Sequence, residues 1–112
     1  MTDFRVRVLP RAREDLDRIV GWIHERSPEG AARLLIAFEK IQTSLKKSPE
    51  AFSKAPEADL LGIELRQAFF RTGKGNTYRM IVRCLGREVQ ILRVRGPGQP
   101  SLTAEEIDEQ QA

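Results

Sequence analysis

The chain has 112 residues, of which 40% are hydrophobic and 31% are charged, and its formal net charge is +3. A chain of this length forms a single domain that can bury a core, and its single cysteine excludes an internal disulfide. No apolar run approaches the roughly 20 residues that a membrane-spanning helix requires. Since the N-terminus also lacks the apolar stretch of a signal peptide, we expect a cytoplasmic protein with no membrane partner.

The charge is unevenly distributed along the chain. Residues 64–99 contain eight basic residues and two acidic ones, whereas residues 101–112 contain four acidic residues and no basic one. A basic block beside an acidic segment indicates an acidic or polyanionic partner, although a solvated charged surface gives the same pattern. We therefore expect one domain over residues 1–100, followed by an acidic C-terminal tail over residues 101–112.

The N-terminal half shows a change of hydrophobic period. Apolar and charged residues alternate over residues 4–9, which predicts a strand, and a 3.6-residue period then predicts a helix over residues 11–26. Ser27 supplies a capping hydroxyl and Pro28 a first-turn proline, so a second helix is expected to follow and to end near residue 48. The two helices should form a hairpin.

The C-terminal half returns to the period of strands. After an irregular connector, residues 49–63, with one helical turn around Phe52, we predict three antiparallel strands joined by short turns. They cover residues 65–70, 77–84 and 88–95. A Thr103–Glu106 capping box predicts a short tail helix. The fold class is therefore α+β, in the order β-α-α-β-β-β, with the helical hairpin packed on an antiparallel sheet.

Arginines are concentrated in the predicted sheet. If Met80 and Leu92 both face the helices, strict alternation gathers four arginines on the opposite, outer face, namely Arg79, Arg83, Arg93 and Arg95. Arg66 on the preceding strand could join them. Guanidinium groups stay charged and bind phosphates and carboxylates through paired hydrogen bonds. The alternative is that these arginines only keep an open sheet face solvated.

The other candidate residues and motifs do not form a recognisable catalytic or nucleotide-binding site. The glycine-containing loop over residues 72–77 lacks P-loop spacing and precedes no helix, so we interpret it as a tight turn. His24 has no triad partners, and Cys84 is expected on the core face as an inert thiol. Tyr78 is expected to face inward, and Trp22 to lie half exposed. We predict neither a metal site nor a cofactor.

Three segments carry a family resemblance. Residues 9–16, 78–82 and 89–94 read LPRAREDL, YRMIV and VQILRV. Together with the order of elements, they resemble the RelE/ParE superfamily of bacterial toxin–antitoxin toxins over residues 4–96. The resemblance implies a growth-inhibiting toxin associated with plasmid stabilisation and neutralised by a cognate antitoxin that folds around it, in a toxin–antitoxin hetero-oligomer.

The superfamily contains two activities. RelE-like members are ribosome-dependent mRNA endonucleases, and by that resemblance the candidate catalytic residues are Arg66, Arg79 and Arg93. Such enzymes also carry a Tyr or a basic residue after the last strand, where this sequence has Gly96-Pro97-Gly98-Gln99-Pro100. The catalytic set is therefore incomplete.

ParE-like members share the long helical hairpin and poison DNA gyrase. Many carry a His-Gly and basic pair after the last strand, a pattern that this chain lacks. The sequence favours a non-catalytic ParE-like toxin that binds its target, such as DNA gyrase, through six residues: Arg79, Arg83, Arg93, Arg95, Gly96 and Pro97. The alternatives are a RelE-like endonuclease acting at the ribosome and an inactive interaction module.

The acidic tail suggests an internal cover. Its carboxylates could fold back over Arg93 and Arg95, in which case deletion of residues 101–112 should strengthen partner binding at low salt. The alternative is a solvated tail.

Overall fold

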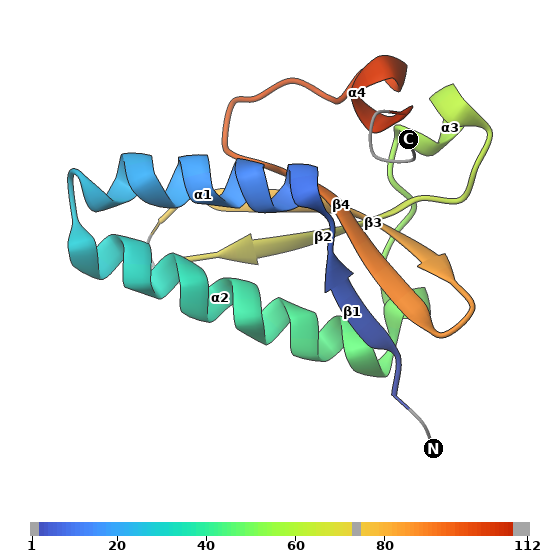
Figure 1. The fold of residues 1–112 in the computed structure, drawn as a ribbon, viewed down its shortest axis with the longest axis horizontal. Coiled ribbons are helices and arrows are strands. Elements are labelled where there is room, and N and C mark those ends of the chain that lie inside the picture. The colour runs from blue at the N-terminus through green and yellow to red at the C-terminus, as the bar shows by residue number, and fades with distance from the viewer. Residues whose placement is uncertain (1–2, 73–74, 109–112) are drawn as a thin grey trace.

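The computed structural model describes residues 3–72 and 75–108, which form two long helices, a sheet and three short helical turns. Figure 1 shows α1 and α2 side by side along one face of the sheet. The long elements are β1 (Arg5–Val8), α1 (Pro10–His24), α2 (Pro28–Lys47), β2 (Arg66–Arg71), β3 (Thr77–Leu85) and β4 (Glu88–Arg95). The short turns are a 3-10 turn (Pro49–Ala51), α3 (Ala58–Leu61) and α4 (Ala104–Asp108). The predicted α+β class and element order are confirmed.

The helix boundaries follow the signals in the sequence. Pro10 and Pro28 occupy the first turns of α1 and α2, where a missing N–H costs nothing. The Ser27 hydroxyl accepts a hydrogen bond from the Gly30 N–H at 2.9 Å and so caps α2. Because α1 and α2 contact each other side by side, the predicted hairpin of helices is confirmed (Figure 1). The sequence predicted a single turn in the connector and missed α3.

The sheet has the strand order β1-β4-β3-β2. The strands β2, β3 and β4 are antiparallel, as predicted, whereas β1 lies parallel to β4 because the helical hairpin returns the chain to the same side. Pairing between β1 and β4 reaches only Val8 and Ile91, since Pro10 then begins α1. The last residues of β4 therefore have no neighbouring strand on that side.

The main core lies between the helices and the sheet. The apolar stripes of α1 and α2 pack against one face of β2, β3 and β4. Phe70 stacks on Tyr78 with ring centroids 5.5 Å apart, and Tyr78 faces inward as predicted. Cys84 packs against the same core, where burial raises the pKa of its thiol. Large side chains of the core include Leu16, Leu34, Phe38, Leu45, Met80, Val82, Val89 and Ile91.

A β-bulge in β4 decides which residues face the helices. Ile81 pairs with Arg93 and Val82 with Ile91, so Leu92 is an extra residue in its strand. Ile91 thus faces the helices, and Leu92 lies in the core on the opposite face. The prediction that Leu92 faces the helices was wrong because strict alternation cannot foresee the extra residue. The arginines of β4 still face away from the helices, on the same outer face as Arg79 and Arg83 of β3.

A second, smaller core covers part of the outer sheet face. Leu65, Ile81 and Leu92 from the sheet pack with α3 and with Leu102 and Ile107 from the C-terminal segment. Figure 1 shows α3 and α4 close together on this side. Residues 102–107 are thus part of the packed structure, so the alternative of a solvated tail does not hold for them. No helix within residues 3–72 and 75–108 is both long and apolar enough to cross a membrane.

The second core predicts that the C-terminal segment contributes to stability. Leu102→Ala removes a side chain that is 1% exposed and should lower the free energy of unfolding by about 2–4 kcal/mol, measured by urea denaturation. Leu60→Ala is the control, because Leu60 on α3 is 59% exposed and should change it by less than about 0.5 kcal/mol. Equal stability of both variants would show that the segment is not packed.

Candidate functional site

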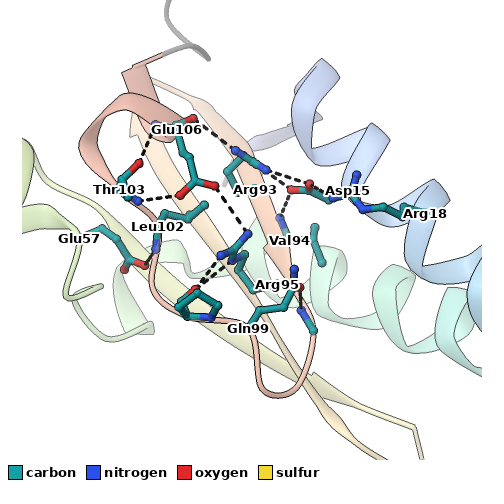
Figure 2. A network of polar contacts seen from close by, with 12 residues as sticks. Asp15, Arg18, Glu57, Arg93, Val94, Arg95, Gln99, Leu102, Thr103 and Glu106 are labelled. Atoms are coloured by element: carbon teal, nitrogen blue, oxygen red, sulfur yellow. Dashed lines mark hydrogen bonds and ion pairs between the residues drawn. The ribbon is translucent and has the colours of Figure 1, made fainter.

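The carboxylate of Asp15 joins α1 to β4. Arg93 Nε donates to Asp15 Oδ2 at 2.8 Å and Arg93 Nη2 donates to Oδ1 at 3.0 Å, a paired arrangement. The Val94 N–H also donates to Oδ2, at 2.9 Å. Asp15 therefore supplies an acceptor on the part of β4 that β1 does not reach. Figure 2 shows the carboxylate between Arg93 and Val94, with Arg18 approaching from the same helix.

The environment of Asp15 favours its charged form. Burial acts to raise the pKa of this carboxyl, but the hydrogen bonds from Arg93, Val94 and Arg18 outweigh burial and hold the pKa below its usual value of 3.8. An uncharged Asp15 would withdraw the negative charge to which Arg93 donates two hydrogen bonds. The pair is therefore ionised at neutral pH.

A second buried acid, Glu57, holds the connector and the C-terminal segment against β3. Arg79 donates to both carboxylate oxygens of Glu57, at 3.0 and 2.7 Å, and to the Gln67 side chain at 3.2 Å. The Leu102 N–H donates to Glu57 Oε2 at 3.0 Å. Burial acts to raise the pKa of Glu57, but the hydrogen bonds from Arg79 and Leu102 hold it below 4.5.

The third arginine, Arg95, binds the segment that follows β4. Its Nε and Nη2 donate to the Pro100 carbonyl at 3.2 and 2.7 Å, and the carboxylate of Glu106 lies 3.9 Å from Nη1. The predicted capping box is confirmed, because Thr103 and Glu106 exchange side chain to backbone hydrogen bonds of 2.9 and 3.2 Å. The Glu106 carbonyl also accepts from Arg93 (Figure 2). The cover over the arginines is therefore present, and the Pro100 and Glu106 carbonyls form part of it.

The arginine face is not the open surface that alternation predicted. Arg93 is only 9% exposed and Arg95 only 8%, because α1 and the C-terminal segment pack against them. Arg79 is partly buried against Glu57, whereas Arg83 is paired across the sheet with Gln90 and lies outside this network. Four arginines do share the outer face, but Arg79, Arg93 and Arg95 are engaged in contacts within the chain.

The structure separates the candidate catalytic arginines. Arg66 pairs in register with Val82, on the face toward the helices, and donates to the carbonyls of Glu50 and Phe52. The expectation that Arg66 joins Arg79 and Arg93 was wrong, because an even-numbered position of β2 faces the other way. Arg66, Arg79 and Arg93 therefore do not form one cluster on a single face of the sheet.

The chain after β4 borders a hollow of about 390 Å³. Gly96 and Pro97 form one wall, and Trp22 and Tyr78 contribute aromatic surface. The Gln99 side chain accepts a hydrogen bond from the Gly96 N–H, which closes the loop on itself. The hollow is also lined by Arg18, Ile19, Ile23 and Asn76. The mixture of apolar walls and polar rim suits a side chain of a partner protein.

Sequence reasoning missed the two carboxylates that organise this region. Asp15 follows Ala12 by three residues and precedes Ile19 by four, so it lies on the apolar stripe of α1. An acid within a buried stripe was the available signal. Glu57 had no such signal, because it lies in an irregular connector.

A comparison with known families agrees with this geometry. The family model described as the ParE toxin of the type II toxin-antitoxin system, parDE, matches residues 6–99, which span both helices and all four strands. The chain belongs to the ParE toxin family. A search of curated proteins found no match. The expected relationship to the RelE/ParE superfamily, on its ParE-like branch, is thereby confirmed, and membership implies an antitoxin partner for this toxin.

Loss of the Asp15 carboxylate should destabilise the toxin strongly. Asp15→Asn removes the carboxylate charge that faces the buried Arg93, so the free energy of unfolding should fall by about 3–5 kcal/mol in urea denaturation. Asp17→Asn is the matched control on the same helix, with an exposed side chain, and should have an effect below about 0.5 kcal/mol. Similar losses in both variants would refute the role assigned to Asp15.

Stability should also depend on acidity. Because Asp15 and Glu57 have lower pKa values in the folded chain than their usual 3.8 and 4.5, their contribution is complete above those values. It is lost as the pH falls below them. Urea midpoints measured from neutral pH downward should therefore decrease in this range, with a shallower decrease for Asp15→Asn. A midpoint that stays constant would contradict the assignment.

Proposed function

We propose that this ParE-family chain stops growth by binding DNA gyrase without breaking a covalent bond, in the cytoplasm, and that a cognate antitoxin neutralises it. Family membership supports the toxin role. The binding mode is supported by the arginines themselves. Arg79 and Arg93 each direct two donors at a buried carboxylate, and Arg66 lies on the other face of the sheet. RNA cleavage would require such groups to converge on one phosphate.

The loop after β4 is one part of the predicted target-binding set that is open to a partner, and Arg83, outside the buried network, is another. Gly96 and Pro97 line the hollow beside Trp22, whose side chain is 59% exposed. In this proposal the loop and Trp22 contact the target. Arg93 and Arg95 act as positioning residues, because they fix the end of β4 from which the loop departs. Exposed Trp beside a concave surface is a common anchor of protein interfaces.

The antitoxin is proposed to cover the helical hairpin. Trp22 on α1 and Leu35 and Ile36 on α2 are large apolar side chains left exposed. A disordered acidic and apolar segment could bury them and meet the surrounding positive charge, and this burial would offset the cost of ordering the segment. Contact with Trp22 would place antitoxin and target on overlapping surfaces.

The proposal predicts inhibition of gyrase by the purified toxin. Supercoiling should be lost and cleavage complexes should accumulate at micromolar dose, and Trp22→Ala should need a dose about 30-fold higher if it is an anchor worth about 2 kcal/mol. Leu60→Ala, which removes an equally exposed side chain on α3, should act as wild type.

Three results would contradict the proposal. Unchanged supercoiling and cleavage-complex levels would exclude gyrase as the target. New in-frame transcript ends after induction would instead support ribosome-dependent RNA cleavage. Harmless expression without an antitoxin would favour an inactive interaction module.

A further inference from the structure

Three arginines lie together on the outer sheet face, at the end nearest the β3–β4 turn. Arg5 on β1 is in register with Glu88 on β4, and Arg7 is in register with Gln90, which also pairs with Arg83 on β3. Residues in register share a face, and the intervening Val6 and Val89 pack toward the helices. We call Arg5, Arg7 and Arg83 the basic patch.

The basic patch carries more positive charge than its neighbours neutralise. Glu88 is the carboxylate that both β1 arginines share, at 3.6 Å from Arg5 and 3.4 Å from Arg7. The side chains of these arginines are 83% and 60% exposed. The guanidinium group of Arg83 makes no hydrogen bond or ion pair with another residue in the described ranges. One acid thus faces three guanidinium groups.

The C-terminal cover does not extend to the basic patch. The second core contains Leu65, Ile81 and Leu92, which lie nearer the other end of the sheet, and α3 and α4 pack there. Beyond them, toward the turn, Arg83, Glu88 and Gln90 are partly exposed. The outer face is therefore divided into a half closed by internal ion pairs and a half that presents arginines to solvent.

The spacing of the patch fits a partner with several regularly placed anions. Arg5 and Arg7 lie two residues apart on one strand, which corresponds to about 6.6 Å, and Arg83 lies two strands away, about 9.6 Å. These separations are within about one Debye length at 0.1 M salt, so the three charges act together. Guanidinium groups bind phosphate oxygens through paired donors.

We propose that the basic patch binds the phosphate backbone of duplex DNA. The choice of a duplex follows from the sheet, which holds the arginines in a fixed array and places no aromatic side chain among them on which unpaired bases could stack. The choice of DNA rests on the proposed function, since gyrase holds duplex DNA. The patch then contacts DNA while the loop after β4 contacts the enzyme.

The test measures binding of the purified full chain to a short labelled DNA duplex. Fluorescence anisotropy reports the binding at a series of increasing salt concentrations. Three phosphate contacts predict a slope of log affinity against log salt near −2.7. The triple variant Arg5→Gln, Arg7→Gln, Arg83→Gln should flatten that slope and weaken binding at low salt by ~10-fold or more. The matched control is Arg33→Gln, Lys40→Gln, Lys47→Gln, which removes three exposed charges from one stripe of α2. It should keep the wild-type slope.

Equal losses in the two triple variants would overturn the patch, because net charge alone would explain them. Absence of duplex binding at low salt would also overturn it. Tighter binding of duplex RNA, of single strands or of anionic lipid vesicles would overturn the assignment to DNA. Gyrase inhibition measured on the same samples separates the two proposals. Inhibition without DNA binding contradicts only the patch, and patch-dependent DNA binding without inhibition contradicts only the gyrase proposal.

Discussion

The buried carboxylate of Asp15 meets two requirements of the fold at once. β1 stops at Val8, so the last residues of β4 lack a strand partner on that side, and Asp15 accepts the Val94 N–H there. The same carboxylate neutralises Arg93, which the bulge at Leu92 directs away from the main core. Without it, β4 would end in an unpaired backbone donor beside a buried charge, and both are costly. This contact adds to the apolar packing that positions α1 on the sheet.

Buried ion pairs explain how an arginine-rich strand can be an interior element. Such pairs add little net stability, because desolvation opposes their attraction, but breaking one partner away is strongly unfavourable. Here Arg79, Arg93 and Arg95 connect the sheet to the connector, to α1 and to the segment after β4. They therefore specify where these segments lie. The charge that first suggested a docking surface is largely used to hold the chain together.

The surfaces left open are consistent with a toxin that works by binding. An exposed Trp22 borders a hollow that the loop at Gly96 also lines, and a separate group of arginines faces solvent at the turn end of the sheet. These surfaces differ in chemistry, one apolar and one cationic. Contacts of the first kind supply binding energy through burial, and contacts of the second kind supply salt-dependent attraction and orientation. Two such surfaces would let a single small domain bind a protein and the nucleic acid that this protein holds.

The sequence by itself determined the element order, the helical hairpin, the antiparallel strands and the capping box, because each depends on local period or on the chemistry of neighbouring residues. It also indicated that the arginines of β3 and β4 share a face, but from a strict alternation that the bulge at Leu92 breaks. Only the tertiary structure decided that Leu92 forms a bulge, that Arg66 faces the helices and that Asp15 and Glu57 neutralise the buried arginines. Register and long-range pairing depend on contacts between segments far apart in the chain, such as Asp15 with Arg93, and no local pattern records them.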